Sequence, residues 1–248
     1  MMNQLSSLWN YVKLFGCVIR IKLGFAKPSA LIKFLLNPNW EIRWDAADFL
    51  DNLPDKAVIT PVFNILQQES NQVVVKHLIY VLQSNKAWDE LFLCLDSAEY
   101  YVRSYAASVL SYSGETRFVE SLLKKMCEYG DNEYIYHDNI YFSALRGIVD
   151  KSSVRLIYDY LPNATPPMKK NLLELLGHSK DEQVFGYLLD ALKDPNAEVR
   201  EGTVLGLMHL GNLQAIPHLR ELLNDPFKDI QDNVKMALHE LENVTLQT

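Results

Sequence analysis

The chain has 248 residues, of which 48% are hydrophobic and 22% are charged, and its formal net charge is −7. This composition is typical of a folded protein with a substantial core. The acidic balance argues against a general nucleic-acid binder, because affinity for phosphate requires clustered lysine and arginine. The three cysteines lie far apart and form no CxxC pair, so neither a disulfide framework nor a zinc site is indicated. A reducing, cytoplasmic location is expected.

Residues 1–29 are predicted to form an N-terminal capping or amphipathic helix. Its apolar residues recur at helical spacing in two stripes. The first stripe contains Leu5, Leu8, Val12, Phe15 and Ile19, and the second contains Leu14, Val18, Ile21 and Phe25. All charged residues among the first 33 are basic. We favour a cap that covers the first repeat. The alternative is that residues 1–27 bind a membrane surface as a basic amphipathic helix.

Residues 30–248 repeat one unit that consists of two helices joined by a turn. The pattern is clearest near the C-terminus, where Asp194-Pro195 returns as Asp225-Pro226. A fixed period of this size indicates stacked repeats. The second helices align on the apolar anchors Ile42, Val74, Val102, Ile140, Met168, Val199 and Ile230. Residues four and eight positions after each anchor are also apolar, except Thr203, so they form one buried stripe. The sequence predicts an all-α, right-handed solenoid of about seven helix pairs.

The longest spacing between anchors separates Val102 from Ile140, in the fourth unit. The extra residues form an acidic, tyrosine-rich insertion at about 129–139. Insertions in repeat proteins map to loops on one face, often the functional face. We therefore expect a role in partner binding for Tyr134, Tyr136, His137 and Asp138.

Three segments open predicted second helices with the same pattern. They are Glu41-Ile42-Arg43, Tyr101-Val102-Arg103 and Glu198-Val199-Arg200. Together with the Asp-Pro turns they resemble HEAT repeats, of the short bacterial HEAT-like type named after phycobilisome bilin lyases. The resemblance covers about residues 30–243 and specifies fold far better than function. It implies that the shared arginine ties neighbouring repeats together through carboxylates and carbonyls.

Several side chains of the second helices are predicted to point away from the buried stripe. They are Trp44, Asp48, His77, Tyr80, Tyr105, Phe142 and Arg146. Tyrosine, tryptophan and arginine are the residues that most often anchor protein interfaces. The competing interpretation is that some of them pack beneath the insertion or the N-terminal helix. We expect a concave groove that binds a basic or amphipathic segment of a partner protein.

No catalytic residue, cofactor or metal is predicted. His178 and His209 occupy equivalent positions in successive units, and Glu240 follows in the next unit. Helices packed about 8–10 Å apart could just let these side chains share a metal. No close pair of ligands on one helix supports such a site, so solvated polar side chains are the preferred interpretation. His239-Glu240 resembles one of the four His-Glu pairs of deoxyhypusine hydroxylases, and a single pair is insufficient.

The leading functional hypothesis is a non-catalytic protein-binding scaffold or adaptor. Enzymatic activity is not expected, because the sequence contains no GxSxG, P-loop or GxGxxG motif. The alternative, which the family resemblance raises, is a bilin lyase or chromophore chaperone whose groove holds a tetrapyrrole. Trp44, Asp45 and Asp48 also resemble the sites of DNA-glycosylase solenoids, but an acidic solenoid would repel phosphate.

Overall fold

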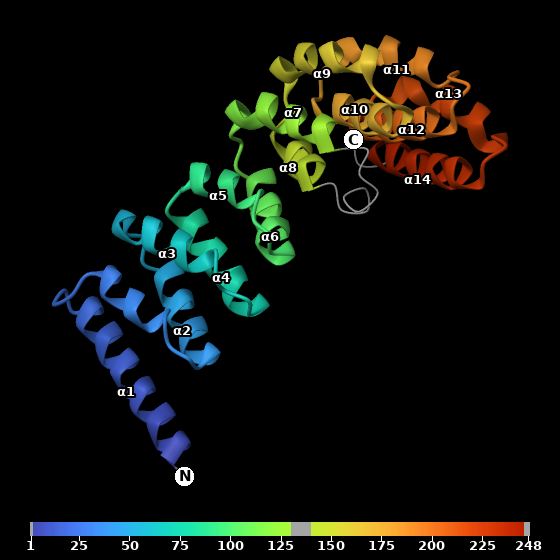
Figure 1. The fold of residues 1–248 in the computed structure, drawn as a ribbon. Coiled ribbons are helices and arrows are strands. Elements are labelled where there is room, and N and C mark those ends of the chain that lie inside the picture. Colours follow the sequence, from blue (N-terminus) through green and yellow to red (C-terminus); the bar gives the residue numbers. More distant parts are fainter. Residues whose placement is uncertain (1, 130–139, 246–248) are drawn as a thin grey trace. The chain divides into compact units, whose positions relative to one another are not determined.

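The computed structural model describes residues 2–129 and 140–245, and in this part of the chain every regular element is a helix. The chain divides into two compact units, residues 1–113 and residues 114–248. Each unit is a stack of helix pairs, as an α-solenoid requires (Figure 1). The predicted insertion, with Tyr134, Tyr136, His137 and Asp138, lies outside the described residues.

The first unit contains one N-terminal helix and three helix pairs. Its elements are α1 (Met2–Lys22), η1 (Pro28–Phe34), α2 (Trp40–Asp51), η2 (Lys56–Val58), α3 (Ile59–Leu66), α4 (Gln72–Ser84), α5 (Trp88–Cys94) and α6 (Tyr100–Ser111). The second helices α2, α4 and α6 pack in succession, α2 on α4 and α4 on α6. The first helices are short, and the first of them, η1, is a 3₁₀ helix throughout.

The described part of the second unit contains four helix pairs. Its elements are η3 (Thr116–Phe118), α7 (Val119–Tyr129), α8 (Ile140–Ile148), η5 (Lys151–Ser153), α9 (Val154–Tyr160), η6 (Leu161–Asn163), α10 (Pro166–His178), η7 (Glu182–Val184), α11 (Phe185–Ala191), α12 (Ala197–Leu210), η8 (Leu213–Ala215), α13 (Ile216–Glu221), η9 (Leu222–Asn224) and α14 (Lys228–Thr245). The described residues thus contain the seven pairs that the sequence predicts.

The predicted register of the second helices is confirmed. Residues at the anchor, four-residue and eight-residue positions are buried in every pair except at Ile140, which is half-buried. Thr203, the polar exception, is fully buried, and its hydroxyl donates to the carbonyl of Val199 at 2.7 Å. The helix thus satisfies this hydroxyl internally, so a polar residue is tolerated in the stripe.

The turns before two of the second helices supply helix caps. The side chains of Asn39 and Asn196 accept hydrogen bonds from the backbone amides of Glu41 and Glu198. These bonds satisfy amides that the first turn of a helix leaves unpaired. At the other end of α12, Gly211 has a φ of 81°, a left-handed conformation that glycine adopts without strain.

Arginines that follow the anchors link neighbouring repeats in both units. Arg43 forms a two-pronged ion pair with Glu69, with nitrogen–oxygen distances of 2.7 and 3.0 Å. Arg200 binds Asp225 in the same way, at 2.8 and 3.1 Å. Each arginine also donates to two carbonyls of the turn before its own helix, as Arg103 does. The structural role implied by the family resemblance is confirmed for Arg43 and Arg200, whereas the hydrogen bonds of Arg103 go to the carbonyls of its own turn.

Only one of the two predicted stripes of α1 is buried. Leu14, Val18 and Ile21 are buried where α1 packs on η1 and α2. Val12, Phe15 and Ile19 of the other stripe are exposed, as is Phe25 after the helix. Leu5 and Leu8 belong to α1, and their side chains lie outside the described part. The helix therefore covers the first repeat with one face and leaves a second apolar face open. Among the described residues, no helix combines the length and hydrophobicity needed to span a bilayer.

Candidate functional site

A cluster of aromatic side chains bridges α2 and α4 in the first unit. Trp44 meets His77 edge to face, with ring centroids 5.8 Å apart, and His77 meets Tyr80 in the same way at 6.1 Å. Asp48 lies beside them, with its Oδ1 3.6 Å from Nδ1 of His77. All four side chains are half-buried. The indole nitrogen of Trp44 is buried and has no hydrogen-bond partner among the described residues. These four predicted residues therefore form one partly exposed surface, which we call the aromatic cluster.

Tyr105 extends this surface on α6. Its hydroxyl accepts a hydrogen bond from Nε2 of Gln72 at 3.0 Å, which connects α6 with α4. Its ring stacks near Tyr101, with centroids 6.5 Å apart. Tyr101 is exposed and was not among the predicted residues.

The two remaining predicted groove residues lie on α8, in the second unit. Arg146 is exposed, and its guanidinium lies 5.9 Å from the ring centroid of Phe142. This distance is within the range of a cation–π contact. The five other residues belong to the first unit, so one groove lined by all seven remains a prediction.

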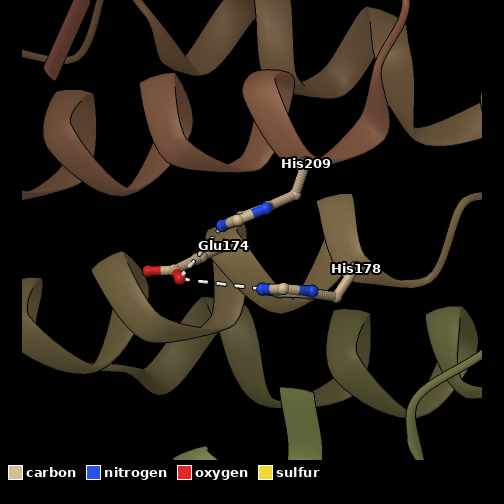
Figure 2. A group of neighbouring side chains, drawn as sticks. All are labelled: Glu174, His178 and His209. Carbon is tan, nitrogen blue, oxygen red and sulfur yellow. Dashed lines mark ion pairs between the residues drawn. The ribbon is translucent and has the colours of Figure 1, made fainter. Parts of the chain in front are cut away.

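A second cluster, in the second unit, consists of Glu174, His178 and His209. Glu174 and His178 lie one turn apart on α10, and His209 lies near the end of α12. The two imidazole rings stack with centroids 3.9 Å apart and an interplanar angle of 26°. Figure 2 shows that both rings turn a nitrogen toward the same carboxylate. The distances from Glu174 Oε1 are 3.7 Å to Nε2 of His178 and 3.5 Å to Nε2 of His209.

Glycines explain why these two histidines meet. A Cβ atom on Gly177 would lie 2.0 Å from the backbone oxygen of Gly206. A Cβ on Gly202 would lie 2.3 Å from the backbone oxygen of Lys170. Real Cβ contacts are never this short, so only glycine permits α10 and α12 to approach so closely. The close approach brings residues near the two helix ends, including both imidazoles, into direct contact.

Burial affects the pKa values of this cluster, unlike those of an ion pair on the surface. Burial by itself raises the pKa of Glu174, but the two imidazoles outweigh it and lower that pKa to about 2. Burial lowers the pKa of His178. At neutral pH the cluster therefore contains a carboxylate anion beside a largely neutral imidazole. The Nε2 atom of His178 is buried and lacks a hydrogen-bond partner among the described residues.

Sequence reasoning identified His178 and His209 but missed Glu174. It considered Glu240 as the third group, whereas the side chain of Glu240 is exposed on α14. The sequence did contain a signal for Glu174. Glu174 and His178 are four residues apart, and residues with this spacing lie on one face of a helix. The signal for the close approach was Gly177, together with Gly202 and Gly206 one repeat later.

The fold and these sites define a helical-repeat protein, and comparison with known proteins refines the class. Residues 154–239 match the family model for HEAT repeats. This match covers less than half of the chain and, with the stacked pairs of both units, supports a HEAT-like family. No curated protein matches the sequence.

Several solved structures resemble the chain in fold. Human deoxyhypusine hydroxylase is 15% identical, with a TM-score of 0.39, and the alignment covers 94% of this chain and 90% of that one. The CpcE–CpcF complex of phycocyanin lyase from Nostoc is 18% identical, with a TM-score of 0.43 and coverages of 87% and 95%. YibA of E. coli is 19% identical, with a TM-score of 0.42 and coverages of 87% and 81%. None of these likenesses bears on function.

Proposed function

We propose that the chain is a non-catalytic protein-binding scaffold or adaptor, which binds its partner through the exposed face of its second helices. The aromatic cluster of α2 and α4 is the observation that supports this proposal. Trp44, His77 and Tyr80 form a continuous set of ring contacts and are all half-buried. Aromatic side chains held in place in this way lose little conformational freedom when a partner covers them.

The charge around the aromatic cluster indicates the chemistry of the partner. Helix α2 carries four carboxylates, at Glu41, Asp45, Asp48 and Asp51, against one arginine that is already paired with Glu69. Burial, followed by the charges of Asp48 and Glu41, raises the pKa of Asp45. This accumulation of negative charge favours a basic or amphipathic segment, attracted by charge and held by burial of its apolar residues. The three cysteines are all free, which suits a reducing compartment such as the cytoplasm.

Alanine substitution of the cluster tests this proposal. Affinity capture from the native host with mass spectrometry first supplies a partner, whose dissociation constant is then measured by calorimetry. Trp44→Ala together with Tyr80→Ala is expected to weaken binding at least about tenfold, or about 1.4 kcal/mol. Tyr105→Ala together with Arg146→Ala is expected to weaken it to a similar extent if the binding surface includes both units.

One control variant shows which surface binds. Leu93→Ala removes an exposed apolar residue from the first helix α5 and is expected to leave affinity unchanged. If Leu93→Ala weakens binding while the cluster variants do not, the interface lies on the first helices. A shift in bilin absorbance on mixing bilin with the purified protein, lost in Trp44→Ala, would favour the lyase or chaperone alternative instead.

A further inference from the structure

The Glu174–His178–His209 cluster has the atomic composition of a transition-metal site. Imidazole nitrogen and carboxylate oxygen are ligands for zinc and neighbouring divalent metals, and two histidines with one glutamate form a known three-ligand set. One ligand atom from each of the three side chains lies within 4.8 Å of the other two. Figure 2 shows that both imidazole rings are turned toward the carboxylate of Glu174.

The two carboxylate–imidazole distances in the cluster are too long for direct hydrogen bonds and leave room for a bridging ion or water. Glu174 Oε1 lies 3.7 Å from His178 Nε2 and 3.5 Å from His209 Nε2. An N–H···O hydrogen bond spans about 2.7–3.2 Å, so both contacts are too long. Two ligands that each bind one zinc ion at about 2.1 Å in tetrahedral geometry are separated by about 3.4 Å. A bridging ion would also give a partner to the buried Nε2 of His178.

We propose that Glu174, His178 and His209 bind one divalent transition-metal ion, with zinc as the ion that the ligands suit best. The side chains of Glu174 and His178 are 10% and 15% exposed and that of His209 is 23% exposed. The cluster is therefore mostly buried, and its most exposed side is that of His209. Because the ligands come from two helices, the ion ties α10 to α12 and stabilises only the folded state.

The test uses metal-free full-length protein titrated with Zn²⁺ and, separately, with Co²⁺. One equivalent of Zn²⁺ is expected to bind and to raise the melting temperature, and bound Co²⁺ is expected to show the visible absorption of a low-coordinate site. His209→Gln is expected to weaken binding more than about tenfold, since losing even a hydrogen-bond partner of a ligand costs that much. His218→Gln is the matched control, because His218 is exposed on α13 of the same unit.

Two outcomes would overturn the proposal of a metal site. One is the absence of stoichiometric Zn²⁺ binding, which would make the cluster an ion pair or a water-bridged site. The other is equal loss of binding in His209→Gln and His218→Gln. If His209→Gln fails to fold, nitrogen NMR of the wild-type imidazoles still decides, because Zn²⁺ must shift the Nε2 resonances of His178 and His209 and no others.

A separate observation concerns α1, which carries a largely exposed apolar face. Five residues of this face are each at least half exposed: Trp9, Val12, Phe15, Ile19 and Leu23. At 100° per residue, the four within the helix fall in an arc of about 120°. Lys13 and Arg20 border one side of this arc and Lys22 borders the other, and all three are exposed. Long basic side chains on both flanks of an apolar face are typical of helices that lie in a membrane interface.

A basic groove runs beside this face, between α1 and η1. Its volume is about 760 Å³, and Lys13, Arg20 and Lys33 are among the residues that line it. The chain is acidic as a whole, yet its first 33 residues contain five basic residues and no acidic one. The positive charge is therefore concentrated where the apolar residues are exposed, and an anionic lipid surface complements both features.

We infer that α1 docks on an anionic membrane surface, with the Trp9–Leu23 face in the acyl boundary and the basic groove on lipid phosphates. Cosedimentation with phosphatidylcholine vesicles, with and without phosphatidylserine, tests this inference. Binding is expected only with phosphatidylserine and is expected to weaken at high salt. Val12→Glu with Ile19→Glu, and separately Lys13→Glu with Arg20→Glu, should each reduce binding at least about tenfold, or about 1.4 kcal/mol.

The test of membrane binding has one control variant and defined contrary outcomes. Tyr112→Glu changes a residue that is 85% exposed elsewhere in the first unit, and it should leave binding unchanged. Failure to bind phosphatidylserine vesicles, or binding that survives both pairs of substitutions, would overturn the inference. If the protein instead forms a dimer in analytical ultracentrifugation that Ile19→Glu dissociates, a second copy covers the face and the membrane assignment is wrong.

Discussion

The contact between α2 and α4 and the contact between α10 and α12 each join the second helices of two successive repeats. Different residues fill these two contacts. Helices α2 and α4 contain no glycine, and Trp44 and His77 meet between them. In α10 and α12 the backbones themselves are in contact at Gly177 and Gly206. Aromatic spacers produce a broad, partly exposed surface, whereas glycine contacts bring two imidazoles within van der Waals distance. The same repeat thus produces a partly exposed aromatic surface in one unit and a compact polar cluster in the other.

Leucines of the buried stripe are expected to show the largest effects, and to show them equally in both units. Leu110 and Leu207 lie eight residues after their anchors and are fully buried. Leu110→Ala and Leu207→Ala are each expected to cost about 2–5 kcal/mol, because each removes buried methyl groups and leaves a cavity. Thermal and urea denaturation measure this cost. If both changes are silent, the register common to the two units is wrong.

Glycine substitutions test the contrast directly. A Cβ on Gly206 would lie 2.5 Å from the backbone oxygen of Leu173. The backbone cannot move aside as a flexible side chain can. Gly206→Ala is therefore expected to lower the free energy of unfolding by about 2–3 kcal/mol or more. The change should also separate the two imidazoles and abolish any metal binding.

Gly186→Ala is the matched control for this experiment. Gly186 is exposed on α11, and nothing lies within 4 Å of the Cβ it would acquire. Alanine is a better helix former than glycine, so this change should stabilise the unit by up to about 1 kcal/mol. If Gly206→Ala is as harmless as Gly186→Ala in a urea melt, the helices are not held in backbone contact.

The repeat pattern was predictable from the sequence because a buried stripe requires apolar residues at every equivalent position. Thr203 alone broke the pattern, and its hydroxyl is satisfied within its own helix. The Glu174–His178–His209 cluster was only partly predictable, because it depends on the distance between two helices. That distance is set by glycines whose importance shows only once the helices are packed. The sequence also could not predict which stripe of α1 is buried, because both stripes are apolar and both have helical spacing.

The arginine–carboxylate pair of the second unit should make stability depend on pH. Hydrogen bonds from Arg200, opposed by burial, lower the pKa of Asp225 below its ordinary value. A carboxyl with a lowered folded-state pKa contributes stability above its unfolded-state pKa, about 3.9, and this contribution disappears as pH falls through the folded-state value. Asp225→Asn is therefore expected to cost about 1.5–3 kcal/mol at pH 7, the range for hydrogen bonds to charged groups.

Urea denaturation of the wild type and of Asp225→Asn at several pH values measures this dependence. The difference between the two proteins should persist down to about pH 4 and shrink below it. Asp229→Asn is a suitable control, since Asp229 is exposed on α14 of the same unit. A difference that grows as the pH is lowered would contradict the assignment, because it would mean that the protonated carboxyl stabilises the fold.

The smallest expected effect concerns the one polar residue in the buried stripe. Ala46 and Ala106 occupy the position of Thr203 in the first unit, and all three side chains are fully buried. Within the part of the chain that the structure describes, the hydroxyl of Thr203 bonds only to the carbonyl of Val199, four residues earlier in the same helix. That carbonyl can accept the backbone amide of residue 203 as well, so Thr203→Val leaves no buried group unpaired. The valine methyl takes the space of the hydroxyl, and the change is expected to alter stability by less than about 1 kcal/mol in either direction. A loss above about 2 kcal/mol in urea denaturation would instead mean that this hydroxyl helps to fix the close packing of α12 on α10, as Gly202 beside it does.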